Sequence, residues 1–151
     1  MRLVIVAAGS WKRGPERDLY DHYAKRITFP LQLLEIEEKK KLKPAALKAR
    51  EGELSLAKVP DGAVLITLDE GGRTLSSAAF AKKLGNWRDE ARDVAFLIGG
   101  AGGLDEAVKK RADLVLGLGP MTWPHLLVRG MLAEQIYRAQ SILAGHPYHR
   151  E

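Results

Sequence analysis

Apolar and polar positions along the chain form blocks that predict strands and helices in alternation. Four blocks are short, mainly apolar runs, as expected for strands that are buried on both faces of a parallel sheet. A fifth block alternates apolar and polar residues, which is typical of a strand near the edge of a sheet. The predicted strands are residues 2–8, 31–37, 63–68, 93–98 and 113–118, of which 31–37 is the alternating one. After the third of them we expect a loop, Asp69-Glu70-Gly71-Gly72-Arg73, whose glycines allow positive φ.

A helical pattern follows each predicted strand. Pro15 and Pro44 suit the first turn of a helix, while Ser76 or Ser77 and, further along, Asp105 suit helix caps. The predicted helices are residues 15–27, 44–57, 76–88, 105–111 and 126–144. Strands that alternate with helices predict an α/β fold with a mainly parallel sheet flanked by helices, in a single domain that spans residues 1–151. Periodicity alone favours an ordinary doubly wound sheet.

A run of glycines, Gly99-Gly100-Ala101-Gly102-Gly103, lies between the fourth predicted strand and the next predicted helix. Its spacing fits neither the G-x-G-x-x-G pattern of dinucleotide-binding loops nor a nucleotide-triphosphate loop, which disfavours dehydrogenases and P-loop enzymes. One interpretation is a tight strand-to-helix turn. The other is a site where backbone groups approach a flat nucleoside at the carboxyl end of the strand.

The loop before the last predicted helix, residues 116–125, holds two glycines and two prolines around Met121, Thr122 and Trp123. Such a loop is stiff, and it could serve only as a connection in which Thr122 starts the helix cap and Trp123 is buried. Its backbone could instead line a pocket beside the glycine run. The residues alone leave both interpretations open.

The last predicted helix carries a broad apolar stripe that includes Val128, Leu132 and Ile136. A stripe of this kind indicates core packing, and its width also admits a dimer interface. On the same helix, Glu134 and Arg138 are four positions apart, the spacing of an ordinary surface ion pair.

The C-terminal tail places His146, Tyr148, His149 and Arg150 within five residues. Arginine suits phosphate groups, and tyrosine and histidine suit stacking on bases, so this composition favours contact with RNA. A metal site is disfavoured because two histidines need further ligands and none is adjacent. A frayed terminus is the remaining alternative.

Composition narrows the function further. The chain has 24 Lys and Arg against 19 Asp and Glu, a net charge of +5, which permits an anionic partner but equally serves general solubility. The absence of cysteine excludes disulfides, thiolate nucleophiles and cysteine-containing zinc sites. No apolar run is long enough to span a membrane, so we expect a cytoplasmic protein that has no membrane partner.

Several short segments and single residues together carry a specific resemblance to a known family. They are Ile66-Thr67-Leu68-Asp69-Glu70 with Ser76-Ser77, Phe96-Leu97-Ile98-Gly99-Gly100, Met121-Thr122-Trp123-Pro124-His125, then Arg129, Glu134, Tyr137 and Arg138, and finally Tyr148-His149-Arg150. Each piece is weak alone, but the set resembles the RlmH family of SPOUT-class methyltransferases in the same order over essentially the whole chain.

This resemblance implies a SPOUT-type fold with a C-terminal trefoil knot, a homodimer, and S-adenosyl-L-methionine as the cofactor. It implies methylation of N3 of a pseudouridine in large-subunit (23S) ribosomal RNA, with the assembled ribosome as the partner and the tail of one subunit completing the pocket of the other. Carried over by position, the cofactor contacts are Leu68, Gly99, Leu118, Gly119, Pro120, Met121, Thr122 and Trp123.

The chemistry requires the acceptor N3–H to lose its proton, so we expect a base, or a cation that stabilises the deprotonated ring, close to it. The expected catalytic residues are His149, Arg150, Tyr148, Arg138 and Glu134, and the expected substrate contacts are His125, Arg129, Tyr148, His149 and Arg150. Within these sets, His149 is the candidate base and Arg150 the candidate charge stabiliser. Two other classes stay open: an RNA-binding or assembly factor without cofactor, and a Rossmann-like nucleotide enzyme.

Overall fold

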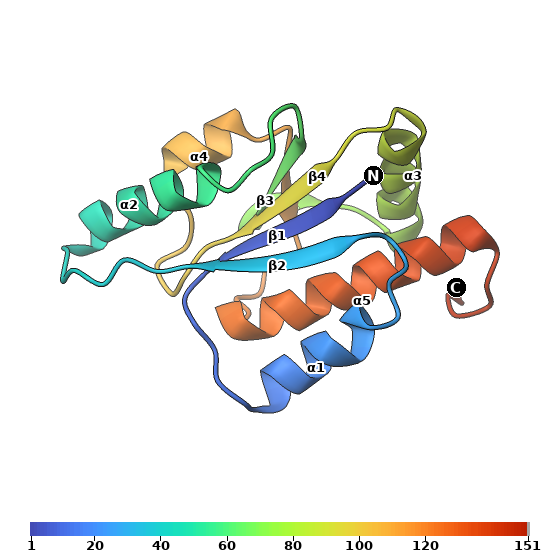
Figure 1. The fold of residues 1–151 in the computed structure, drawn as a ribbon, viewed down its shortest axis with the longest axis horizontal. Helices are drawn as coiled ribbons and strands as arrows, with labels where there is room; N and C mark the ends of the chain where they lie inside the picture. The colour runs from blue at the N-terminus through green and yellow to red at the C-terminus, as the bar shows by residue number, and fades with distance from the viewer. Residues whose placement is uncertain (151) are drawn as a thin grey trace.

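Five parallel strands form the centre of the structure, a computed structural model that describes residues 1–150 (Figure 1). The strands are β1 (Leu3–Ala8), β2 (Leu31–Ile36), β3 (Val64–Thr74), β4 (Val94–Ile98) and β5 (Leu114–Gly117), in the spatial order β2-β1-β4-β3-β5. The helices are α1 (Pro15–Ala24), α2 (Pro44–Leu56), α3 (Ser77–Asp89), α4 (Glu106–Arg111) and α5 (His125–Ala144). This confirms the predicted α/β class, the parallel sheet and the edge position of residues 31–36.

Helices cover both faces of the sheet, which explains the unbroken apolar runs of the central strands (Figure 1). In β1, Leu3, Ile5 and Ala7 belong to the core under α1, α3 and α5, whereas the intervening Val4 and Val6 belong to the core under α2 and α4. Every residue of this strand is therefore buried.

The helix starts follow the expected local signals in part. Pro15 and Pro44 stand in the first turns of α1 and α2, and the Ser76 hydroxyl accepts a hydrogen bond from the Ala79 N–H at 3.0 Å. Asp105 occupies the cap position of α4, but its side chain makes no capping hydrogen bond. Helix α1 ends at Ala24, three residues before the predicted end.

The third strand differs from the prediction, which ended it at Leu68 and placed a glycine loop after it. The structure continues β3 to Thr74, and after a register shift the strand pairs with β5 a second time. The glycines were expected to provide positive φ, yet neither Gly71 nor Gly72 has it. Gly72 is needed for close approach, because a Cβ there would lie 2.7 Å from the backbone nitrogen of Gly117.

Within residues 1–150, no helix is both long and apolar enough to cross a bilayer. The trefoil knot implied by the resemblance stays a prediction. What the fold contributes to function is an edge of the sheet where β1, β3, β4 and β5 all end, because parallel strands bring their carboxyl ends together.

Candidate functional site

A cavity of about 620 Å³ opens at this carboxyl edge of the sheet. Its walls come from the ends of β3 and β4, the glycine run 99–103, the loop 118–124 and the first turn of α5. The two loops that the sequence singled out therefore lie on one cavity. Of the expected cofactor contacts, the lining residues are Leu68, Gly99, Leu118, Gly119, Met121, Thr122 and Trp123. Pro120 belongs to the same loop but is not among the lining residues.

The glycine run forms a tight turn at some positions and leaves open space at others. A Cβ on Gly99 would lie 2.5 Å from the carbonyl carbon of Gly103, and the Gly103 N–H donates to the Gly100 carbonyl at 2.9 Å. By contrast, a Cβ on Gly102 or Gly103 would meet no atom within 4 Å. Gly99 is thus required by the turn, and Gly102 and Gly103 keep the cavity open.

The loop 118–124 is fixed by hydrogen bonds across the cavity wall. The Thr122 hydroxyl donates to the Glu70 carboxylate at 2.6 Å, and the Trp123 indole N–H donates to the Leu118 carbonyl at 3.3 Å. The structure contradicts the interpretation in which Trp123 is buried, because this residue is 41% exposed and Met121 is 71% exposed. The side chains of Met121 and Trp123 are therefore accessible at the rim of the cavity.

Charged residues at the cavity include several that were not among the expected catalytic, cofactor or substrate residues. Asp69 and Glu70 line it from the extension of β3, and Lys109 lies 3.5 Å from Asp69 and 2.7 Å from Glu106. The hydrogen bond to Glu106 raises the pKa of Lys109. Because the prediction placed residues 69–74 in a loop, it did not place the carboxylates of Asp69 and Glu70 at the site. A longer third strand would have placed them beside the carboxyl end of β4.

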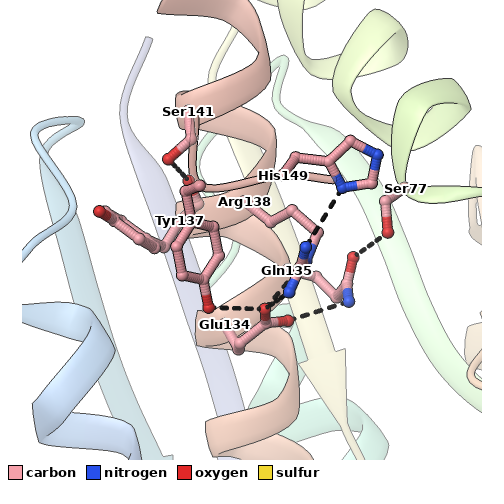
Figure 2. Close-up of polar contacts among 8 residues, drawn as sticks. Ser77, Glu134, Gln135, Tyr137, Arg138, Ser141 and His149 are labelled. Atoms are coloured by element: carbon pink, nitrogen blue, oxygen red, sulfur yellow. Dashed lines mark hydrogen bonds and ion pairs between the residues drawn. The ribbon is translucent and has the colours of Figure 1, made fainter. Parts of the chain in front are cut away.

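Glu134 is the centre of a second polar cluster, at the middle of α5 (Figure 2). Its carboxylate accepts hydrogen bonds from the Arg138 guanidinium, from the Gln135 amide at 2.9 Å and from the Tyr148 hydroxyl at 3.0 Å. A guanidinium nitrogen of Arg138 also lies 3.2 Å from Nδ1 of His149. The tail therefore folds back onto the helix, which contradicts the frayed alternative, and the ion pair is partly buried.

The environment of this tail cluster, by which we mean Glu134, Arg138, Tyr148 and His149, shifts two pKa values in the same direction. Hydrogen bonding to Glu134 raises the pKa of Arg138, which keeps the guanidinium charged. Burial, followed by hydrogen bonding with Tyr23 and Glu134, raises the pKa of Tyr148 far above its usual range. The Tyr148 phenol is therefore a hydrogen-bond donor at neutral pH, not a base.

The tail cluster and the cavity lie at different places along α5. His125, at the start of the helix, lines the cavity, and Glu134 follows nine residues later, about 13 Å along the helix axis. Among residues 1–150, no residue of the tail 145–150 lines the cavity, and Arg150 is exposed. Seven of the eight expected cofactor residues thus lie on the cavity, and four of the five expected catalytic residues form the tail cluster, but the two groups do not meet in a single chain.

Arg129 requires a correction, because a direct substrate contact was expected for it and the structure buries it completely. Its guanidinium donates to the Glu35 carboxylate at 3.0 Å and to the Gly9 carbonyl at 3.0 Å, and it stacks over the Trp11 ring at 4.5 Å. These contacts assign Arg129 to holding the loop after β1. His125, next to it, is partly exposed to the cavity, and burial, followed by the charge of Arg129, lowers its pKa.

A second cavity, of about 550 Å³, lies between α1, α5 and the start of α3. Its wall includes Tyr23, Met131 and Glu134, and it also includes Leu116, Leu118 and Gly119, which line the first cavity too. The segment 116–119 is therefore a partition between the two cavities. No group of three or more His, Cys, Asp or Glu in the described part of the chain is arranged to hold a metal ion.

Comparisons with known proteins agree with this architecture. A family model described as "Predicted SPOUT methyltransferase" matches residues 1–149. The chain is 59% identical to "Ribosomal RNA large subunit methyltransferase H" of Rhodospirillum centenum and 57% identical to the protein of that name from Paramagnetospirillum magneticum, each over 99% of both chains.

Solved structures at low sequence identity share the fold. A probable methylase family protein from Haemophilus influenzae Rd KW20 matches 99% of this chain and 70% of its own, with a TM-score of 0.59 and 13% identity. The SpoU methyltransferase AviRb from Streptomyces viridochromogenes, solved in complex with AdoMet, matches 92% of this chain and 58% of its own, with a TM-score of 0.51 and 13% identity.

The parallel sheet, the cavity at its carboxyl edge and the glycine-bearing loops around it define a methyltransferase of the SPOUT class. The chain belongs to that family, and within it to the family of ribosomal RNA large subunit methyltransferase H. The resemblance to the RlmH family is thereby confirmed.

Proposed function

We propose that this enzyme uses S-adenosyl-L-methionine to methylate N3 of a pseudouridine in 23S ribosomal RNA, on assembled ribosomes in the cytoplasm. The observation that carries the proposal is the coincidence of the expected cofactor residues on one cavity in a chain 59% identical to a protein named as a large-subunit rRNA methyltransferase. The AdoMet complex of the structurally similar AviRb supports the choice of cofactor.

The residues of the cavity fit this cofactor. A volume of about 620 Å³ lies within the range of pockets for nucleoside-sized ligands. Glycines at positions 102, 103 and 119, where a Cβ would meet nothing within 4 Å, leave the backbone accessible to a flat base. Asp69 and Glu70 bring negative charge to a cavity whose ligand carries a sulfonium and an ammonium group.

Filling the cavity by mutation should block the cofactor without disturbing the fold. We expect Gly102→Trp to weaken S-adenosyl-L-methionine binding about a hundredfold, because open space surrounds this position and a large side chain would occupy it. Isothermal titration calorimetry would measure the affinity. Lys58→Trp, which adds the same side chain at an exposed position on the amino edge of the sheet, should leave the affinity unchanged. Equal binding by the Gly102 variant would place the cofactor elsewhere.

In the proposed reaction, the bound cofactor supplies an electrophilic methyl group, so the protein's own task is orientation and control of one proton. The N3–H of the acceptor must lose its proton, and His149 is our candidate base. Arg138 and Arg150 bring positive charge that favours the deprotonated ring. Tyr148, kept protonated by its raised pKa, would donate a hydrogen bond and hold Glu134 in place.

We further propose that the active form is a homodimer in which the tail cluster of one copy meets the cavity of the other. The support is the distance along α5 between His125 and Glu134, which leaves each site without the other in one chain. Met121, 71% exposed at the cavity rim, is a suitable residue for a partner to cover. The predicted trefoil knot belongs to the same proposal.

Methyl transfer from labelled S-adenosyl-L-methionine tests the function directly. The acceptors would be assembled ribosomes, isolated large subunits and protein-free 23S rRNA, with the modified nucleoside identified by mass spectrometry. We expect one N3-methylated pseudouridine, formed on ribosomes. No transfer to any RNA, despite measured cofactor binding, would reject the rRNA substrate and leave the methyltransferase class, whereas no cofactor binding would favour an RNA-binding factor that has lost the cofactor.

A further inference from the structure

The loop between β1 and α1, residues 9–14, exposes two cations that the proposed reaction does not use. Lys12 and Arg13 are both exposed, and neither takes part in an ion pair with any residue from 1 to 150. Unpaired cations on a loop are usually mobile and bind anions weakly, since ordering them costs conformational entropy.

Here, the base of the loop is held in place by hydrogen bonds and by a buried guanidinium. The Gly9 N–H donates to the Ile36 carbonyl at 2.9 Å, and the Trp11 N–H donates to the Glu35 carboxylate at 3.1 Å. From α5, the fully buried Arg129 side chain donates a hydrogen bond to the Gly9 carbonyl and stacks on the Trp11 ring. The two residues that follow Trp11 are therefore presented from a fixed base.

The fixed loop lies beside the rim of the cavity. β1 pairs with β4, with Ala7 opposite Ile98, so the loop leaves the sheet next to the glycine run. A Cβ on Gly9 would lie 3.8 Å from Nε2 of His125, which lines the cavity. A nucleotide that reaches this cavity must leave its flanking phosphates outside it, at the rim.

We propose that Lys12 and Arg13 contact the phosphate backbone of the RNA substrate, and that Arg129 is the positioning residue that fixes their loop. This inference rests on the proposed rRNA methylation and adds the surface on which the RNA lies. Phosphate contacts position a substrate without reading its sequence, and a fixed loop loses less entropy on binding than a mobile one. One guanidinium therefore links the cofactor edge of the sheet to the RNA-facing surface.

The salt dependence of binding is the decisive test of the two cations. Binding of the Lys12→Ala/Arg13→Ala variant to large ribosomal subunits would be measured over a series of salt concentrations, together with KM and kcat for methyl transfer. We expect Kd and KM to rise about tenfold at physiological salt with little change in kcat. Each lost phosphate contact removes about 0.7–0.9 from the slope of log K against log salt, so the slope should fall by about 1.5.

The matched control removes the same two charges from the opposite edge of the sheet. Lys58 and Arg88 lie near the ends of α2 and α3, just before the strands that follow, and Lys58→Ala/Arg88→Ala should leave Kd and the salt slope unchanged. Equal effects of the two double variants would overturn the proposal, since they would mean a general charge effect. Cofactor affinity should stay at the wild-type value in both.

Arg129 is tested as a positioning residue by a double-mutant comparison. Arg129→Met should raise KM and lower the salt slope when Lys12 and Arg13 are present, and it should add little to either in the Lys12→Ala/Arg13→Ala background. A merely structural role would change KM equally in both backgrounds and would overturn this assignment. If the wild-type enzyme methylates rRNA and the loop variants keep the wild-type KM and salt slope, only the proposed role of the loop is rejected. If the wild-type enzyme transfers no methyl group to rRNA, the proposed rRNA function itself is rejected.

Discussion

A mixture of two inactive variants is expected to recover about a quarter of the wild-type rate of methyl transfer. One variant, Gly102→Trp, has a blocked cavity and an intact tail, and the other, His149→Ala/Arg150→Ala, has an intact cavity and a defective tail. Random exchange of subunits makes half of the dimers mixed, and each mixed dimer holds one complete site of two. Alone, the tail variant should lose at least about a hundredfold in kcat, the usual contribution of proton transfer or positioning. The cavity variant should lose a similar factor in rate at limiting cofactor, because its affinity for the cofactor falls about a hundredfold.

This result would follow only from a site shared between copies. The rate would be measured after mixing, partial unfolding and refolding, to allow exchange of subunits, with each variant treated in the same way as its own control. A further control joins both defects in one chain and mixes it with an equal amount of wild-type chain. A shared site predicts about a quarter of the wild-type rate, because the mixed dimers are then inactive, whereas a site within one chain predicts about half. No recovery in a mixture of proven heterodimers would show that each chain uses its own tail.

The second large effect concerns stability. Arg129→Met is expected to lower the free energy of unfolding by about 3 kcal/mol, because it leaves the Glu35 carboxylate and two backbone carbonyls without their cation. We take the lower end of the usual range for a broken buried pair, since the Glu35 side chain is 35% exposed and water can reach it. For a chain of 151 residues, this corresponds to a fall in Tm of about 6–12 °C.

Urea denaturation and calorimetry would measure this change, with Arg50→Met as the comparison. Arg50 pairs with Glu38 and Glu53 on the surface and is 47% exposed, so its loss should lower the free energy of unfolding much less than the loss of Arg129 does. Similar destabilisation by the two substitutions would mean that the contacts of Arg129 with Glu35 and Trp11 contribute little, and the loop after β1 would then need another explanation for its order.

The order and type of all ten elements could be predicted because each follows from local pattern. Continuous apolar runs and proline or serine at helix starts depend on neighbours in the sequence, and these predictions are confirmed. The extension of β3 through residues 69–74 could not be predicted in this way. It depends on backbone pairing with β5, more than 40 residues later, which only close approach of Gly72 and Gly117 permits.

The candidate site was predictable to a similar extent. The composition of the glycine-rich and proline-rich loops admits binding as one of two interpretations, and both loops line the cavity. The hydrogen bond from Thr122 to Glu70 joins residues far apart in sequence, and no local pattern signals it. Arg129 is the clearest case: an arginine on a helix is usually exposed, and its burial follows from partners on two other segments, the loop after β1 (Gly9 and Trp11) and β2 (Glu35).

The partition formed by residues 116–119 has a thermodynamic consequence. Because the same backbone bounds the proposed cofactor cavity and the cavity between α1, α3 and α5, a shift that fits it to an occupant on one side changes the shape available on the other. Occupancy of the two spaces is then linked, and linkage is reciprocal: the factor by which one occupant alters the affinity of the second equals the factor in the opposite direction. In a dimer whose partner covers the second cavity, the effect of the cofactor on subunit association and the effect of association on cofactor affinity would measure the same coupling free energy.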